Sequence, residues 1–80
     1  MISDRLKQVI LNQLKLKNFE LTQDTKAYQV PGWDSLNHAI ILAAIEKEYD
    51  IHFIIAEILG LKNLGDLQNL VDSKTANKSK

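Results

Sequence analysis

The residues best suited to chemistry in this chain of 80 residues lie around one serine. Ser35 follows Asp34 at the expected start of a helix, and His38 lies one helical turn further on. A hydroxyl and an imidazole at this spacing could act as a nucleophile and its base. A hydrolytic serine, however, needs a strained strand-to-helix turn and an oxyanion hole, and the sequence offers neither strands nor a glycine two residues later. We therefore interpret the protein as a non-enzyme.

The sequence also offers few residues that could support metal or thiol chemistry. The chain has no cysteine, so it has no disulfide, no thiolate ligand and no cysteine nucleophile. It has only two histidines, His38 and His52, whose spacing matches no familiar zinc site. We expect no metal site.

A serine at the start of a helix has a second use, which is to carry a phosphodiester. The segment Pro31-Gly32-Trp33-Asp34-Ser35-Leu36 places such a hydroxyl directly after a glycine. Unpaired backbone N–H groups and the positive end of the helix dipole stabilise an added negative charge there by about 0.3–1 kcal/mol. In this interpretation Gly32 lets another protein approach closely, and a buried Leu36 holds the helix start. The simpler alternative is that Asp34 caps the helix and Ser35 occupies a tolerant position.

The elements that must position this segment are helical. Apolar residues recur at spacings of three and four, which predicts helices at residues 3–16, 34–49, 54–59 and about 64–71. Ser3 and Asp34 are the expected N-caps, and Asn63 with Asp66 resembles a capping box. The fold class is therefore all-α, a small four-helix bundle of three main helices and one short helix. A long loop at 17–33, with at most one turn near Asp24, should be pinned by Phe19, Leu21, Tyr28 and Val30.

Charge and hydropathy limit the domain organisation and the kinds of partner that we expect. Three of the 10 basic residues lie in the last seven positions, which leaves 7 basic and 10 acidic residues elsewhere, a net charge of −3. We expect a domain at 1–72, a disordered basic tail at 73–80, and no nucleic acid partner. The longest apolar run, Ala39 to Ile45, is too short to span a membrane, and the N-terminus shows no signal peptide. These features indicate a cytoplasmic monomer.

Apart from the tail, the whole chain resembles the acyl carrier proteins. The resemblance lies in Asp34-Ser35-Leu36 opening the second helix after a long loop, the acidic end at Glu46 to Tyr49, and the short third helix. It implies that Ser35 carries 4′-phosphopantetheine, transferred from coenzyme A by a phosphopantetheinyl transferase, with Asp34 and Leu36 beside it. The thiol of that group would hold acyl intermediates as thioesters for a synthase, ligase or acyltransferase of bacterial lipid or polyketide biosynthesis.

Departures from the family pattern suggest a dedicated carrier for an accessory pathway. The early second helix has Asn37 and Ile40 where carriers of primary fatty acid synthesis are usually acidic, and Lys47 interrupts the acidic end. We expect partner contacts at Trp33, Asn37, His38, Ile40 and Lys47. If Ile40 faces solvent, these contacts should be more apolar and less sensitive to salt, but it could instead lie beneath the loop.

Three further alternatives stay open at this point. His38 either contacts the phosphodiester when protonated or is a solvated helix residue. An apolar set either lines a cargo pocket or forms ordinary core; its members are Leu42, Ile45, Phe53, Ile58 and Leu61. The protein could also be an aminoacyl or D-alanyl carrier, or an unmodified helical adaptor.

Overall fold

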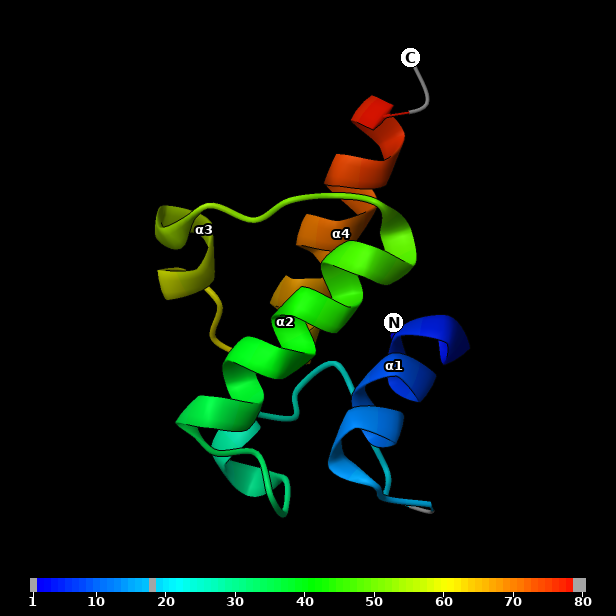
Figure 1. The fold of residues 1–80 in the computed structure, drawn as a ribbon, viewed down its shortest axis with the longest axis vertical. Helices are drawn as coiled ribbons and strands as arrows, with labels where there is room; N and C mark the ends of the chain where they lie inside the picture. The colour runs from blue at the N-terminus through cyan, green and yellow to red at the C-terminus, as the bar shows by residue number, and fades with distance from the viewer. Residues whose placement is uncertain (1, 18, 79–80) are drawn as a thin grey trace.

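The computed structural model describes residues 2–17 and 19–78 and consists of helices joined by loops (Figure 1). The four α-helices are α1 (Asp4–Leu14), α2 (Ser35–Tyr49), α3 (Ile55–Leu59) and α4 (Leu64–Lys78), and a short 3-10 helix, η1 (Ala27–Gln29), interrupts the long loop. No strand occurs among the described residues. The predicted all-α bundle of three main helices and one short helix is confirmed.

Two of the helix starts follow directly from their capping side chains. The Leu6 N–H donates to Ser3 Oγ at 3.2 Å, and the Asn37 N–H donates to Asp34 Oδ1 at 2.8 Å. Each bond satisfies a donor that a helix cannot satisfy internally. α1 ends two residues earlier than expected, because Lys15 adopts a left-handed conformation with φ of 58°. The caps thus fix where α1 and α2 begin.

The core is shared by α1, α2 and α4. Its fully buried side chains come from all three helices: Leu6, Ile10, Ile41, Ile45 and Val71. α3 contributes no buried side chain and stands to one side of the other helices in Figure 1. The bundle is therefore built on three helices, and α3 packs against it more loosely.

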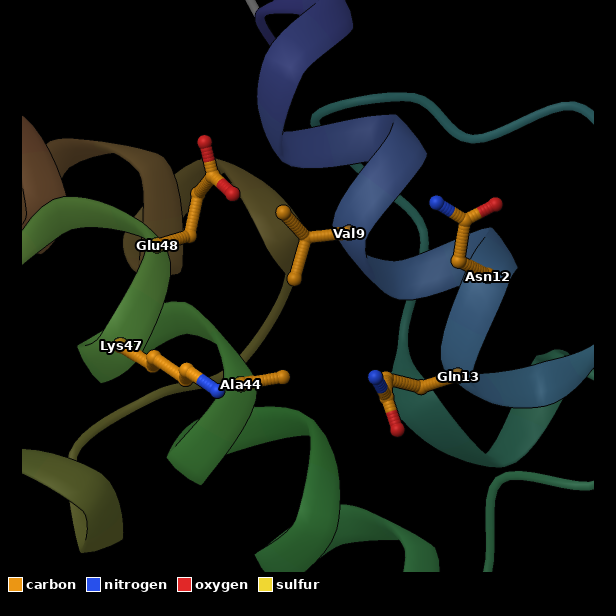
Figure 2. A pocket seen from close by; sticks show the side chains of 6 residues that line it. All are labelled: Val9, Asn12, Gln13, Ala44, Lys47 and Glu48. Carbon is orange, nitrogen blue, oxygen red and sulfur yellow. The ribbon is translucent and has the colours of Figure 1, made fainter.

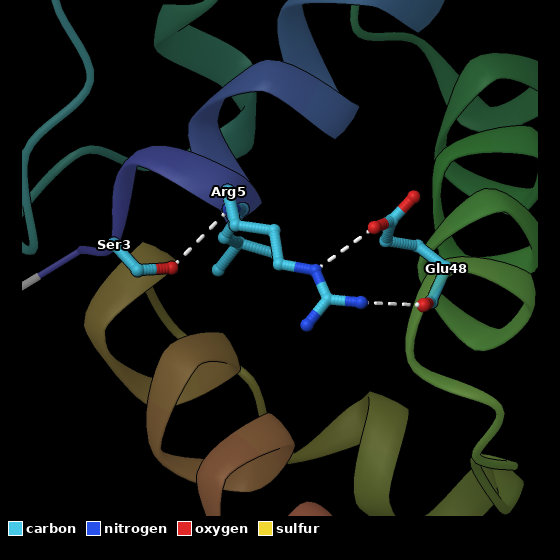
Figure 3. Close-up of polar contacts among 4 residues, drawn as sticks. Ser3, Arg5 and Glu48 are labelled. Carbon is cyan, nitrogen blue, oxygen red and sulfur yellow. Dashed lines mark hydrogen bonds and ion pairs between the residues drawn. The ribbon is translucent and has the colours of Figure 1, made fainter.

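Polar contacts also join α1 to its neighbours. The Arg5 guanidinium binds Glu48 twice, with Nε 2.8 Å from Oε2 and Nη2 2.9 Å from the main-chain oxygen (Figure 3). The same guanidinium lies 4.3 Å from the centre of the Tyr49 ring. The buried Gln68 of α4 accepts the Ser3 N–H at 2.9 Å and donates to Asp72. α1 is thereby fastened to the last turn of α2 and to α4.

The long loop is pinned to the bundle, though not by all the predicted side chains. Leu21 and Val30 are buried and Phe19 packs partly against the core, as expected. Tyr28 is 78% exposed, so its predicted anchoring role is wrong. Its backbone lies in η1, which is also where the single helical turn forms, a few residues beyond the predicted Asp24.

The start of α4 lies directly against this loop. The N–H groups of Leu64 and Gly65 donate to the main-chain oxygens of Thr25 and Gln23, at 2.9 and 2.8 Å. A Cβ on Gly65 would lie 3.0 Å from the Gln23 oxygen, so any larger residue would require the loop to shift by a few tenths of an ångström. The predicted cap is present, since Asn63 Oδ1 accepts the Asp66 N–H at 2.9 Å, while Asp66 accepts from Lys62 rather than from Asn63 itself.

The expected disordered tail at 73–80 is wrong as far as residue 78. α4 continues to Lys78 because a packed helix propagates at lower cost than a new one nucleates. Lys74 supports the extension by pairing with Glu57 at 2.9 Å, and the Thr75 hydroxyl donates to the Asp72 main-chain oxygen at 3.1 Å. Residues 79 and 80 lie outside the described part of the chain.

Candidate functional site

Ser35 is the first residue of α2, and its side chain is exposed. Within the described residues its hydroxyl makes no hydrogen bond. The turn before it is fixed by Gly32, whose φ of 81° is costly for any residue with a Cβ, and whose oxygen accepts from Asn37 Nδ2 at 2.6 Å. Asp34 caps the helix across the same turn. The chain therefore holds a free hydroxyl in a rigid setting.

The backbone around Ser35 favours negative charge. Among the described residues, the N–H groups of Ser35 and Leu36 have no partner, as is usual in the first turn of a helix. These groups and the helix dipole attract an anion placed beside the hydroxyl. The local structure fits a phosphodiester on Ser35 Oγ, since the hydroxyl is accessible and the neighbouring donors are unused.

Trp33 does not lie on the surface, which corrects the prediction that it binds partners. Its side chain is only 9% exposed and belongs to the core. The indole Nε1 donates to Nδ1 of His38 at 3.0 Å, and the two rings are 6.1 Å apart. Because Nδ1 accepts, the imidazole carries its hydrogen on Nε2. His38 is thus half-buried and tied to Trp33, which overturns its interpretation as a solvated helix residue.

An open groove of about 370 Å³ runs from Ser35 along α2. Its α2 side chains recur at spacings of three and four, and Phe53 and Ile58 face them; the α2 set is Ser35, His38, Ala39, Leu42, Ala43 and Glu46. Leu42, Phe53 and Ile58 belong to the apolar set predicted from the sequence, whereas Ile45 is fully buried core and Leu61 lies in a separate, smaller cavity. Three groove residues were not predicted from the sequence, although their helical spacing from Ser35 was a usable signal: Ala39, Ala43 and Glu46.

Glu46 lines this groove at the end of α2 away from Ser35. Its Oε2 accepts the Phe53 N–H at 2.8 Å and lies 4.0 Å from Nδ1 of His52. The carboxylate therefore holds the connection between α2 and α3 in place. α3 is held from the other side by Glu57, which accepts the Ile54 N–H at 2.9 Å and binds Lys74. The Ile54 N–H and the Lys74 ammonium lower the pKa of Glu57, since both favour its charged form.

Large apolar side chains are exposed on α2 and around α3. Leu36 is 71% exposed, so the expectation that it is buried is wrong: it lies one turn before Ile40, away from the face that packs on the core. Ile40 is 41% exposed, which decides that it faces solvent. Ile54, Ile55 and Leu59 are also exposed. We call these five residues the apolar surface.

The remaining predicted contacts, Asn37 and Lys47, are not among the exposed apolar residues. Asn37 is half-buried and its carboxamide is used within the turn. Lys47 lies roughly 18 Å beyond Ser35 along α2, at 1.5 Å per residue. Figure 2 shows Lys47 and Ala44 of α2 facing α1 across a second groove of about 360 Å³, whose α1 side is formed by Val9, Asn12 and Gln13.

Two further properties of the described residues bear on the kind of site. Among residues 2–17 and 19–78, no group of three or more His, Asp or Glu side chains is placed to hold a metal ion. No helix in the same residues is long and apolar enough to cross a membrane.

Comparison with known proteins identifies relatives of the chain. The solution NMR structure of the holo acyl carrier protein from Geobacter metallireducens superimposes with a TM-score of 0.88 and 37% identity, covering 94% of this chain and 86% of that one. The acyl carrier protein of Clostridium acetobutylicum is 27% identical over 75 residues, covering 94% of this chain and 97% of its own length. That of Clostridium perfringens is 26% identical over 72 residues, covering 90% and 95%. No family model matches the chain.

The fold and the exposed serine at the start of α2 define a small helical carrier domain. The chain belongs to the acyl carrier protein family. Members of this family are non-catalytic carriers that normally bear phosphopantetheine.

Proposed function

We propose that this protein is an acyl carrier whose 4′-phosphopantetheine is attached to Ser35 Oγ. The observation that carries the proposal is the position of this hydroxyl: exposed, at the first residue of α2, beside unpaired N–H groups and at the mouth of an apolar groove. When bound, the group supplies a thiol that holds an acyl chain as a thioester. The cysteine-free chain itself provides no competing thiol.

The chain's own residues position the attachment point and shelter the cargo. Asp34 presents Ser35 by capping α2, and the bond between Asn37 and the Gly32 oxygen fixes the approach to it. The N–H groups of the first turn stabilise the phosphodiester charge. Leu42, Phe53 and Ile58 line the groove, so an apolar cargo chain can be buried there away from water.

The apolar surface favours partners that dock mainly through apolar contacts. Leu36 lies next to Ser35, so an enzyme acting at Ser35 meets this side chain first. Such a contact depends little on salt, unlike docking onto a row of carboxylates. We accordingly propose a phosphopantetheinyl transferase and the acyl-loading and acyl-processing enzymes of one dedicated pathway as partners of a cytoplasmic monomer. The relatives do not favour the aminoacyl carrier or the adaptor.

The test is the intact mass after incubation with coenzyme A and a broad-range phosphopantetheinyl transferase. We expect the gain of one phosphopantetheine, and no gain for Ser35→Ala. Ser73→Ala is the matched control, because Ser73 is also an exposed serine on a helix, and it should be modified like the wild type. Modification of Ser35→Ala, or no modification of the wild type, contradicts the proposal.

The dedicated pathway needs its own experiment, which is complementation of a bacterial strain that lacks its fatty acid carrier. A carrier that docks through an apolar surface should be served poorly by enzymes that recognise acidic helices. We expect weak or no rescue even when the protein is fully modified. Efficient rescue would show that it serves primary fatty acid synthesis.

A further inference from the structure

His38 separates two cavities. On one side lies the open groove that begins at Ser35 and continues past Leu42 to Glu46. On the other side lies a smaller cavity of about 50 Å³, formed by residues of the loop, of the link after α3 and of α4: Ala27, Trp33, Leu61, Lys62, Asn63 and Leu67. His38 is the one side chain that lines both. Removal of the imidazole would therefore join them.

The imidazole is held in this place by Trp33. The indole Nε1 of Trp33, which is 9% exposed, donates to His38 Nδ1 at 3.0 Å. If the imidazole swung away, a buried donor would lose its partner, which is unfavourable. His38 therefore acts as a fixed wall rather than as a side chain that yields to a ligand.

The smaller cavity is partly open to solvent, and its mostly apolar lining suits the end of an apolar chain. A single water needs roughly 10–15 Å³ of such space, so the cavity exceeds one water in size. Leu61, Leu67 and Ala27 form much of its wall. The imidazole is what separates this apolar space from the groove beside Ser35.

We propose that His38, locked by Trp33, determines cargo specificity by confining an apolar acyl chain to the outer groove. The inference rests on the proposed carrier function and adds to it the residue that limits where the cargo chain can lie. The groove extends from Ser35 to Glu46, roughly 16 Å at 1.5 Å per residue. It ends at a carboxylate that is already bonded to the Phe53 N–H. The cargo that fits best is therefore a chain whose end is apolar.

The experiment is NMR on protein loaded with butyryl, octanoyl or dodecanoyl groups from the corresponding acyl-coenzyme A, with labelled leucine and isoleucine methyl groups. In the wild type, the terminal methyl of the acyl chain should show contacts to Ile58 and none to Leu67 at any length. In His38→Ala, the dodecanoyl chain should gain contacts to Leu61 and Leu67. His38→Phe refills the space with a ring, so it should still exclude the chain from Leu67, although it leaves the Trp33 Nε1 donor without its acceptor and should be less stable.

Two controls keep the outcome decisive. Mass spectrometry before NMR shows whether the arm and cargo are attached, so a failure of the carrier function is distinguished from a failure of this inference. If His38→Ala does not fold, His38→Asn replaces it, because Asn retains an acceptor for Trp33 while removing the outer half of the ring. Contacts to Leu67 in the loaded wild type, or identical contacts in wild type and the truncated variant, overturn the proposal.

Discussion

A single substitution of Leu36 should weaken the docking of partner enzymes without lowering the stability of the fold. Its side chain is 71% exposed, so Leu36→Ala removes little that the folded chain buries. Surface changes of this kind alter stability by about 0.5 kcal/mol or less, which for a domain of this size corresponds to at most roughly 4 °C in Tm. Burial of a whole leucine contributes about 1.5–3 kcal/mol. Since most of Leu36 is available to a partner, we expect a loss of about 1–2 kcal/mol in docking, or roughly 5–30-fold in Kd.

The assay pairs thermal unfolding with the kcat/KM of a broad-range phosphopantetheinyl transferase, each measured at low and high salt. Leu42→Ala is the matched control, because Leu42 is buried on the same helix and its truncation should cost about 2–5 kcal/mol of stability. Leu36→Ala should lower kcat/KM while leaving Tm nearly unchanged, and Leu42→Ala should lower Tm. The reasoning is refuted if Leu36→Ala unfolds as early as Leu42→Ala, or if the transferase acts on it as on the wild type.

Three further predictions concern stability. Gly65→Ala should cost about 1–3 kcal/mol, because its Cβ would meet a main-chain oxygen at 3.0 Å, whereas Gly60→Ala, with no neighbour closer than 3.6 Å, should be tolerated. Asp34→Ala should lose the α2 cap and about 1 kcal/mol, while Asp34→Asn should keep the cap and lose only a few tenths. The free energy of unfolding should fall at acid pH because of Glu57, whose pKa is lowered in the folded protein. Its contribution to stability is complete above the ordinary pKa of a glutamate and is lost as the pH falls through the lowered pKa. Glu57→Gln should flatten this part of the profile. Urea unfolding, repeated across pH for Glu57, measures all three.

Each of these predictions has an outcome that contradicts it. Equal stability of Gly65→Ala and Gly60→Ala would mean that the loop yields at α4. Equal loss in Asp34→Ala and Asp34→Asn would mean that the negative charge, not the hydrogen bond, stabilises α2. An unchanged acid profile in Glu57→Gln would show that the charge of Glu57, bonded by the Ile54 N–H and Lys74, does not affect folding.

The helices were predictable because their signals are local. Ser3 and Asp34 precede stretches with helical spacing, and both cap as expected. The continuation of α4 beyond residue 72 was missed, because Lys74 finds its partner, Glu57, on another helix. No sequence pattern shows that contact.

The helix start that carries Ser35 was predictable, and the exposure of the residues around it was less so. The serine-containing segment indicated a modified hydroxyl at a helix start, and the structure places that hydroxyl in the open. Which way its neighbours face depends on the rotation of α2 against the bundle. For that reason Leu36 was wrongly expected to be buried. Trp33 precedes α2, and its expected contact with partners was wrong because its indole packs into the core.

The loose packing of α3 has a consequence for how such a protein diversifies. This helix adds no buried side chain and is held by Glu57 to Lys74 and by the bond from Phe53 to Glu46. Its outward residues, Ile55 and Leu59, are therefore open to replacement without loss of the fold. Selection for a new client enzyme can act on these positions while the three-helix core is conserved.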